Sequence, residues 1–349
     1  MTGRQADVIV VGAGPSGSAC AAELARQGVD VLLLHDGTHA VDSVETTQPG
    51  ATGVITSILG PVLGPPHSTV PGARSSWADP SLVETDFLFD PSDGAWAVER
   101  RAFDAAARDA AVERGARLVS ARVTSVEREG DAWQVCAADG ELFGAGFLVD
   151  ATGRAGAIVR RLGARVERHD GLVAMVGEGC PGPDARDGTL VESVEDGWWY
   201  ATTLGDRVSV GLVTHADLLP PAGERDAVWR VLLGQTRHLR SVVSVNEDVF
   251  VRTRRADTSV TEPMHGDGWL AVGDAAAAWD PLSSQGLTAG ILLAGRAARA
   301  IVAGSDALEE WQDDVRMLVE DTVGLQREYY EMETRWPDAP FWRQWERLD

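Results

Sequence analysis

A chain of 349 residues with 44% hydrophobic and 24% charged residues has the composition of a folded protein large enough for two domains. Its net charge of −22 disfavours nucleic acid or an anionic membrane as a partner and would favour a basic substrate or carrier. All 31 basic residues are arginines, and the chain contains no lysine.

The cysteine pattern and the start of the chain suggest where the protein resides. Cys20, Cys136 and Cys180 are dispersed without a C-x-x-C pair, which indicates a reducing compartment and no structural metal. A predicted strand begins almost at once, and no apolar run reaches about 18 residues. We therefore expect a cytoplasmic protein without a signal peptide or membrane span.

Residues 7–36 predict a strand, a glycine-rich turn, a helix and a second strand. Residues 8–11 are apolar and β-branched, which is typical of a buried parallel strand. The helix that follows has an alanine-rich apolar face and ends at Gly28, and residues 31–34 return as the second strand. This is the βαβ arrangement of a dinucleotide-binding domain.

The turn of this unit carries the pattern G-x-G-x-x-G at Gly12, Gly14 and Gly17. The first glycine permits the tight turn, the second lets a pyrophosphate approach the backbone, and the third packs the helix on the sheet. Pro15 and Ser16 open the helix, whose free N–H groups attract an anion. These five residues are predicted to bind the cofactor.

The end of the second strand departs from the usual fingerprint. An acidic residue that holds the ribose hydroxyls is expected near position 35, where this chain has His35, followed by Asp36. Either His35 donates to the ribose or Asp36 reaches back. Both alternatives predict weaker adenosine recognition.

The next segment, residues 41–74, is predicted as loops around a short helix near residues 54–63. Glu45 and His67 are its candidate catalytic bases, although each residue type in a loop is more often a surface or hydrogen-bonded group. Residues 76–90 then predict a strand, and residues 101–114 predict an alanine-rich helix. Three strands follow, at residues 117–126, 132–137 and 141–149.

Two features of these strands concern the cofactor. Val126, at the end of the first, is a candidate cofactor contact. The third runs into the small-residue turn Asp150-Ala151-Thr152-Gly153-Arg154, as expected where a cofactor lies at the carboxyl ends of parallel strands.

Residues 166–258 alternate like antiparallel strands, most clearly at residues 208–213, with a helix near residues 225–235. We interpret this segment as a substrate domain. One strand carries three consecutive aromatic residues, which are either an aromatic wall over the substrate or ordinary sheet core: Trp198, Trp199 and Tyr200.

The chain then returns with a buried strand at residues 268–272, the pair Gly273-Asp274 and a helix at residues 287–303. The tail, residues 308–349, predicts a long helix followed by an aromatic segment. This segment either docks a partner or, as we favour, packs back on the cofactor domain. Its aromatic residues are Trp336, Phe341, Trp342 and Trp345.

The early βαβ unit, the Asp-Ala-Thr-Gly-Arg turn and the late Gly-Asp pair, in this order over essentially the whole chain, resemble FAD-dependent monooxygenases of the p-hydroxybenzoate hydroxylase superfamily. That superfamily includes flavin-dependent halogenases and geranylgeranyl reductases. The resemblance implies FAD as cofactor, with Asp274 at its ribityl chain. The N-terminus of the following helix would face the flavin pyrimidine ring, which is anionic in reduced flavin.

The resemblance also implies further flavin contacts. Arg100 occupies the place of a flavin-contacting arginine, with a surface ion pair as the alternative. The other implied contacts are Asp150, Thr152, Gly153, Gly273, Pro281, Gln285, Gly286 and Leu287.

More specifically, several segments look like LodB-type flavoproteins and the related QhpG-type monooxygenases: residues 150–154, 160–164, 197–200, 280–286 and 335–342. These families imply oxygenation of an aromatic ring, in a tryptophan or tyrosine of a peptide or protein or in a natural-product intermediate. Two departures lie toward the substrate: VETTQP at residues 44–49 replaces a Gly-Glu-Ser-Leu-Pro-Pro-like stretch, and Ala97 replaces a histidine.

The implied reaction proceeds through a flavin C4a-hydroperoxide that transfers OH to the ring, while the protein positions the ring and excludes water. Pro281 is expected near the reactive edge of the flavin, and Trp279 joins the aromatic trio at the substrate. A second G-x-G-x-x-G for NAD(P)H is absent. The resemblance implies that electrons come either from NAD(P)H bound transiently on the FAD domain or from a partner flavin reductase.

Three alternatives remain. Residues 198–204 (WWYATTL) faintly resemble the halogenase signature Trp-x-Trp-x-Ile-Pro, but halogenases use a lysine that this chain lacks. A reductase or dehydrogenase of the geranylgeranyl reductase type would have a long apolar tunnel. A non-catalytic flavin-binding assembly protein would act through its acidic surface and aromatic tail.

The predicted fold is α/β with two domains: a Rossmann-like FAD-binding domain of discontinuous chain, an antiparallel β-sheet substrate domain and a C-terminal helical tail. The FAD-binding domain comprises residues 1–75, 96–165 and 260–305. The substrate domain comprises residues 76–95 and 166–259, and the tail residues 306–349.

Overall fold

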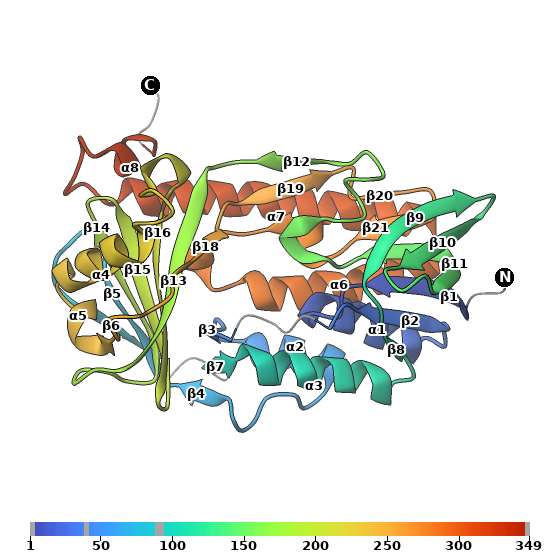
Figure 1. Ribbon diagram of the computed structural model, residues 1–349, viewed down its shortest axis with the longest axis horizontal. Coiled ribbons are helices and arrows are strands. Elements are labelled where there is room, and N and C mark those ends of the chain that lie inside the picture. The colour runs from blue at the N-terminus through green and yellow to red at the C-terminus, as the bar shows by residue number, and fades with distance from the viewer. Residues whose placement is uncertain (1–3, 38–41, 88–93, 346–349) are drawn as a thin grey trace.

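The computed structural model describes residues 4–37, 42–87 and 94–345, in which two eight-stranded sheets dominate (Figure 1). The first sheet has the order β20-β21-β11-β1-β2-β8, extended by β10 and β9. Its strands are β20 (His265–Gly266), β21 (Trp269–Ala271), β11 (Leu142–Asp150), β1 (Arg4–Val11), β2 (Val31–His35), β8 (Arg117–Ser120), β10 (Ala132–Ala137) and β9 (Val123–Glu129).

The centre of the first sheet is parallel, as the βαβ pattern predicts. β1 pairs in parallel with β2 and β11, and β2 with β8. Helices α1 (Pro15–Arg26), α3 (Arg100–Glu113) and α6 (Gly286–Ala303) cover it and bury a common apolar core. Two separate strands replace the single strand predicted at residues 117–126: β8 pairs in parallel with β2, and β9 pairs antiparallel with β10.

Helix α2 (Ala51–Leu59) begins and ends earlier than the predicted range 54–63. Its end is set by Gly60, whose φ of 82° with ψ of −163° is a backbone conformation open mainly to glycine. A three-stranded sheet lies nearby, formed by β3 (Val44–Thr46), β7 (Ala95–Glu99) and β4 (Ser68–Val70).

The second sheet has the order β17-β13-β16-β15-β14-β5-β6, with β18 also paired to β13. Its strands are β17 (Val243–Ser244), β13 (Leu172–Pro181), β16 (Arg207–His215), β15 (Gly197–Leu204), β14 (Gly188–Val194), β5 (Gly72–Ser76), β6 (Val83–Asp86) and β18 (Arg252–Arg255). Helices α4 (Arg225–Gln235) and α5 (Leu239–Val242) cover its outer face. Because β5 pairs with β14, the chain enters this sheet at Gly72, a few residues before the predicted boundary at residue 76.

Three short strands lie between the two large sheets: β12 (Arg165–Arg168), β19 (Ser259–Glu262) and β22 (Ala277–Ala278). The predicted strand over residues 76–90 is only β6 in the described part of the chain, and Leu88 and Phe89 lie outside the described residues. The three cysteines are free thiols.

Helix α6 is long and apolar enough, by length and composition, to cross a membrane. It packs on α1, α2 and α7 (Ser305–Glu331), and half of it is buried. Burial between helices explains the apolar composition, since a core helix of a folded domain meets the same criteria.

The aromatic tail is tied down, as favoured from the sequence, but on the second sheet and not on the cofactor domain. Phe341 and Trp342, in α8 (Pro340–Arg343), are buried with Trp198 and Leu172 of the second sheet. Tyr330, in α7, joins the same cluster. The prediction that the tail packs on the cofactor domain was wrong, because its aromatic partners lie on strands that are distant in the sequence.

We expect Trp342→Phe to lower the free energy of unfolding by about 1 kcal/mol, because the Trp342 indole N–H donates to the Val194 carbonyl at 2.9 Å. Urea unfolding measures this change. Phe250→Leu is the control, since Phe250 is 67% exposed. Equal loss of stability in the two variants would contradict a specific attachment of the tail.

Candidate active site

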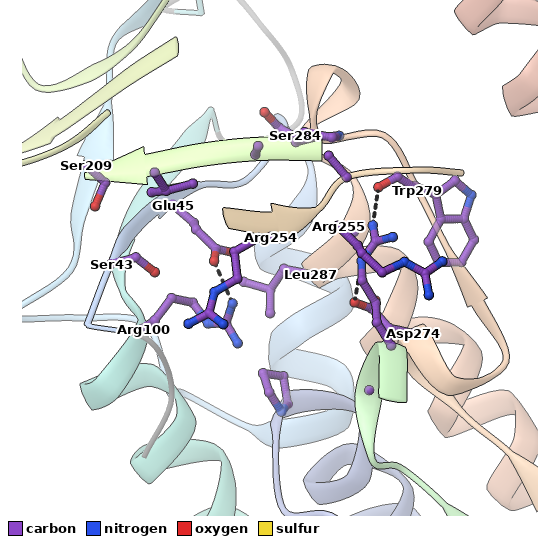
Figure 2. Close-up of a pocket in the computed structure, with 18 of the residues that line it drawn as sticks. Ser43, Glu45, Arg100, Ser209, Arg254, Arg255, Asp274, Trp279, Ser284 and Leu287 are labelled. Carbon is purple, nitrogen blue, oxygen red and sulfur yellow. Dashed lines mark hydrogen bonds and ion pairs between the residues drawn. The ribbon is translucent and has the colours of Figure 1, made fainter. Parts of the chain in front are cut away.

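A cavity of about 830 Å³ lies where the carboxyl ends of the first sheet face the inner surface of the second (Figure 2). Its first wall comes from the α1 turn, the turn after β11 and the start of α6. Its second wall comes from β13, β14, β15, β16 and β18. The predicted site residues that line it are Gly14, Pro15, Ser16, Gly17, Glu45, Arg100, Thr152, Gly153, Trp198, Tyr200, Gly273, Asp274, Trp279, Pro281, Gly286 and Leu287.

The three glycines at the start of α1 have the geometry their spacing predicts. Gly12 has a φ of 108°, and a Cβ there would clash with the Ala151 carbonyl. A Cβ on Gly17 would clash with the Gly12 carbonyl, so this glycine permits close packing. A Cβ on Gly14 would meet no protein atom within 4 Å, and α1 has no side-chain cap. The free N–H groups and the open space beside Gly14 fit a pyrophosphate.

A second uncapped helix, α6, faces the same cavity. Its N-cap is Gln285, whose side chain makes no capping hydrogen bond, and a Cβ on Gly286 would meet nothing within 4 Å. Gln285 itself is not among the lining residues. The N-terminus of α6 therefore fits a second electron-rich group, as the flavin pyrimidine would be.

Asp150 has a different position from the one predicted, because its carboxylate does not line the cavity. It is buried and accepts hydrogen bonds from the backbone N–H groups of Thr152, Ile158 and Val159. Asp150 therefore shapes the turn that presents Thr152 and Gly153 to the cavity. All its acceptor capacity goes to the protein.

Arg154, from the same turn, contacts both Asp274 and Trp279 at the cavity wall. Its guanidinium donates to the Trp279 carbonyl at 2.9 Å and lies 3.5 Å from the Asp274 carboxylate. It also pairs with buried Asp257 at 3.2 Å. Burial raises the pKa of Asp274, and Arg154 opposes that rise.

Arg100 and Glu45 meet at the cavity wall. The Arg100 guanidinium pairs with Glu45 at 2.6 Å and with Asp104 at 3.1 Å. Glu45 is thus engaged by a cation, which disfavours it as a base. His67 does not line the cavity: its Nδ1 accepts the Glu99 N–H, and burial lowers its pKa. The suggestion that His67 is a catalytic base is not supported by this position.

Only part of the aromatic trio faces the cavity. Successive residues of a strand point to opposite faces, so Trp198 and Tyr200 line the cavity while Trp199 packs under α4 against Trp229, at a ring distance of 5.3 Å. The prediction that Trp199 contacts the substrate was wrong for this reason. Trp279, 5% exposed, lines the opposite wall.

His35, Asp36 and Val126 lie outside the lining. His35 ends β2, and its Nδ1 is 4.0 Å from the Asp36 carboxylate. Val126 pairs with Val135 on β10. Their contacts with an adenosine group remain predictions.

The sequence interpretation gave no role to Asp280, which is buried at the cavity wall. It accepts hydrogen bonds from the Tyr330 hydroxyl at 2.7 Å and the Gln326 amide at 2.9 Å, and the Trp198 indole N–H donates to Tyr330 at 2.7 Å. Burial raises the pKa of Asp280 to about 7, against these hydrogen bonds. The network joins Asp280, next to Pro281, to an aromatic ring on the other wall.

We expect ionisation of Asp280 to destabilise the folded protein as the pH rises. Its pKa of about 7 in the folded protein lies above the ordinary value of 3.8. The stability that the neutral carboxyl contributes is therefore fully present below about pH 3.8 and is lost as the pH rises toward 7. Between pH 5 and 8, Asp280→Asn should gain about 3 kcal/mol in unfolding free energy relative to the wild type. Urea titrations at each pH measure this gain.

The control for this titration is Asp248→Asn, since Asp248 is exposed. Its stability difference from the wild type should not change with pH. A flat difference for Asp280→Asn as well would show that Asp280 keeps an ordinary pKa.

Comparison with known proteins agrees with this geometry. The sequence model of the family described as "Tryptophan halogenase" matches residues 81–349, and one described as "NAD(P)-binding Rossmann-like domain" matches residues 10–48. The "Putative FAD-dependent oxidoreductase LodB" of Marinomonas mediterranea is 28% identical, over 97% of this chain and 96% of its own length. The menaquinone reductase of Mycobacterium tuberculosis is 30% identical, over 88% and 78%.

Among solved structures, the "Peptidyl tryptophan dihydroxylase QhpG" superposes with a TM-score of 0.83 at 22% identity, covering 98% of this chain and 78% of its own. This likeness shows the fold. The predicted superfamily, the two-domain fold class and a flavin-dependent oxidoreductase activity are thereby confirmed.

Proposed function

The chain belongs to the tryptophan halogenase family, and we propose that within it this protein is an FAD-dependent monooxygenase that hydroxylates an aromatic substrate. One observation carries the proposal. Two uncapped helix N-termini, those of α1 and α6, open into one cavity whose opposite wall presents aromatic rings. This arrangement fits a flavin dinucleotide with a ring-shaped substrate beside it.

We assign cofactor and substrate to the two sheets. The first sheet with α1, α3 and α6 would hold FAD, with the backbone at Gly14 at the pyrophosphate, Asp274 at the ribityl chain and the N-terminus of α6 at the pyrimidine ring. Bound FAD, once reduced, supplies the activation of molecular oxygen. The second sheet would bind the substrate.

The protein's own task is to orient the ring and exclude water. Tyr200, which is partly buried, would offer its ring to the substrate. The buried Trp198 ring lies beside it at 6.0 Å and is held in one orientation by its hydrogen bond to Tyr330. The tail packs against Trp198 on the same face of the second sheet, beside the cavity, and shields this ring from solvent. Pro281 and Trp279 would confine the substrate from the other side.

The name of one structural neighbour supports a hydroxylating role and suggests the substrate. QhpG, by its name, acts on a peptidyl tryptophan, so we propose a tryptophan or tyrosine of a peptide or protein, or a natural-product intermediate. Halogenation is disfavoured because these 349 residues contain no lysine. We propose NAD(P)H or a partner flavin reductase as the electron source, and a cytoplasmic location in keeping with the free thiols.

A reductase is the second candidate, favoured by the 30% identity to menaquinone reductase. The lining of the cavity argues against a long isoprenoid substrate, because charged side chains interrupt the apolar surface at Glu178, Arg252 and Arg254. An isoprenoid tail would desolvate these groups without pairing them.

The proposal is tested by supplying heavy-isotope oxygen gas to the reduced, FAD-loaded protein with a tryptophan-containing peptide and, separately, with indole-3-acetate. We expect mass spectrometry to find one heavy oxygen atom in the ring of a product, with or without added bromide. A brominated product would establish halogenation. Reduction of menaquinone without oxygen incorporation would establish the second candidate.

A further inference from the structure

Two arginines on β18 face the cavity from the second sheet. Arg252 and Arg254 pair in register with Val176 and Ala174 of β13, and all four side chains line the cavity. Alternation along the strand places both guanidinium groups on the inner face. Figure 2 shows Arg254 extending into the pocket in the region of Arg100 and Leu287.

The carboxylates around the cavity are committed to other groups. Glu45 and Asp104 pair with Arg100. Asp257 pairs with Arg154, Arg168 and Arg255. Asp274 lies 3.5 Å from Arg154, and Asp280 accepts from neutral donors. Glu178 accepts from Ser209 at 2.7 Å, lies 3.8 Å from Arg207 and also interacts with Arg252.

Within the described part of the chain, Arg254 makes no hydrogen bond or ion pair. Arg252 contacts the Phe250 ring at 5.6 Å and lies within electrostatic reach of Glu178. Arg254 therefore faces the cavity without an ion-pair partner among the described residues, although acidic residues outnumber basic ones by 53 to 31 in the chain. A guanidinium is suited to bind a planar carboxylate or a phosphate through two parallel hydrogen bonds.

The groups of the FAD that carry negative charge already have places on the first wall. The pyrophosphate is assigned to the α1 N-terminus and the pyrimidine to the α6 N-terminus. The arginines belong to the second sheet, on the same face as Trp198 and Tyr200. A ligand that meets these side chains joins an aromatic ring to an anionic group.

We propose that the substrate is an aromatic compound with a carboxylate or phosphate group, which Arg254 binds with the help of Arg252. This inference rests on the proposed function and specifies its substrate class. The net charge of −22 repels such an anion at long range, but salt screens that repulsion beyond about 8 Å, whereas the arginines act at contact.

Equilibrium binding to the oxidised, FAD-loaded protein tests the proposal without turnover. The probes share one ring: indole-3-acetate, neutral indole-3-acetamide and 3-indoxyl phosphate, each followed by the change in flavin absorbance. We expect the wild type to bind at least one anion about tenfold more tightly than the amide. The tighter of the two anions identifies carboxylate or phosphate as the group bound.

Variants locate the effect. Arg254→Gln should reduce the preference for the anion to nearly none, Arg252→Gln should reduce it in part, and both should keep the affinity for FAD. Arg186→Gln is the matched control, because Arg186 pairs with Glu84 away from the cavity. It should keep the full preference.

Three results would overturn the proposal: no preference for either anion in the wild type, including no binding of any probe; an unchanged preference in Arg254→Gln; or weaker FAD binding in Arg254→Gln with the preference kept. Oxygen incorporation into a product is measured separately, and none of these three results changes its outcome. Failure of this proposal is thereby distinguishable from failure of the monooxygenase assignment.

Discussion

Gly14→Val is expected to fold with nearly wild-type stability and to bind FAD at least about a hundredfold more weakly. Gly14 has φ −77° and ψ −176°, which any residue adopts, and an added Cβ meets no protein atom within 4 Å. The valine side chain would fill the space next to the α1 N–H groups, where the pyrophosphate must come within hydrogen-bonding distance. Losing several charge-assisted hydrogen bonds of about 1.5–3 kcal/mol each accounts for the size of the effect.

Flavin fluorescence titration and urea unfolding measure the two expectations separately. Gly223→Val is the control, since Gly223 also has open space around it and lies outside the cavity. It should keep both stability and FAD affinity. If Gly14→Val binds FAD with wild-type affinity, the pyrophosphate does not bind at this turn.

Arg100→Met is expected to lower the free energy of unfolding by about 4 kcal/mol, because it leaves the Asp104 carboxylate, 6% exposed, without its cation. FAD affinity should fall about tenfold as well. The first effect follows from the ion pair and the second from a flavin contact, which are the two alternatives that the sequence leaves open for this residue.

The double variant Arg100→Met with Asp104→Asn separates these effects. Removing the isolated carboxylate should restore most of the stability, and the FAD affinity should stay low. If the double variant binds FAD as tightly as the wild type, Arg100 serves only the ion pair with Asp104 and Glu45. Urea unfolding and flavin titration on the same preparations give both answers.

The parts of the fold that the sequence predicts well are those set by local rules. The glycine spacing predicts a tight turn at Gly12, open backbone at Gly14 and close helix packing at Gly17, and the structure has all three. Helix α4 covers the predicted range 225–235, and α6 differs from its prediction by one residue. Side chains also alternate between the two faces of a strand, so Trp199 must point away from the face that Trp198 and Tyr200 share.

The features that were missed depend on contacts between distant residues. Asp280 is defined by Gln326 and Tyr330, which lie 46 and 50 residues later in the chain. The tail binds the second sheet through the bond between Trp342 and Val194, which are 148 residues apart. Asp150 has a typical cofactor-motif position, yet its carboxylate is used by backbone N–H groups up to nine residues later. No local pattern reports such pairings.

The central claim is that this cavity activates oxygen to hydroxylate a ring. Stopped-flow absorbance after mixing anaerobically reduced, FAD-loaded protein with oxygen tests it most directly, because no substrate need be known. We predict two resolved phases, in which a transient species distinct from reduced and oxidised flavin precedes reoxidation and is unaffected by bromide. Reoxidation in a single phase, with and without indole-3-acetate, would contradict the account and favour the reductase.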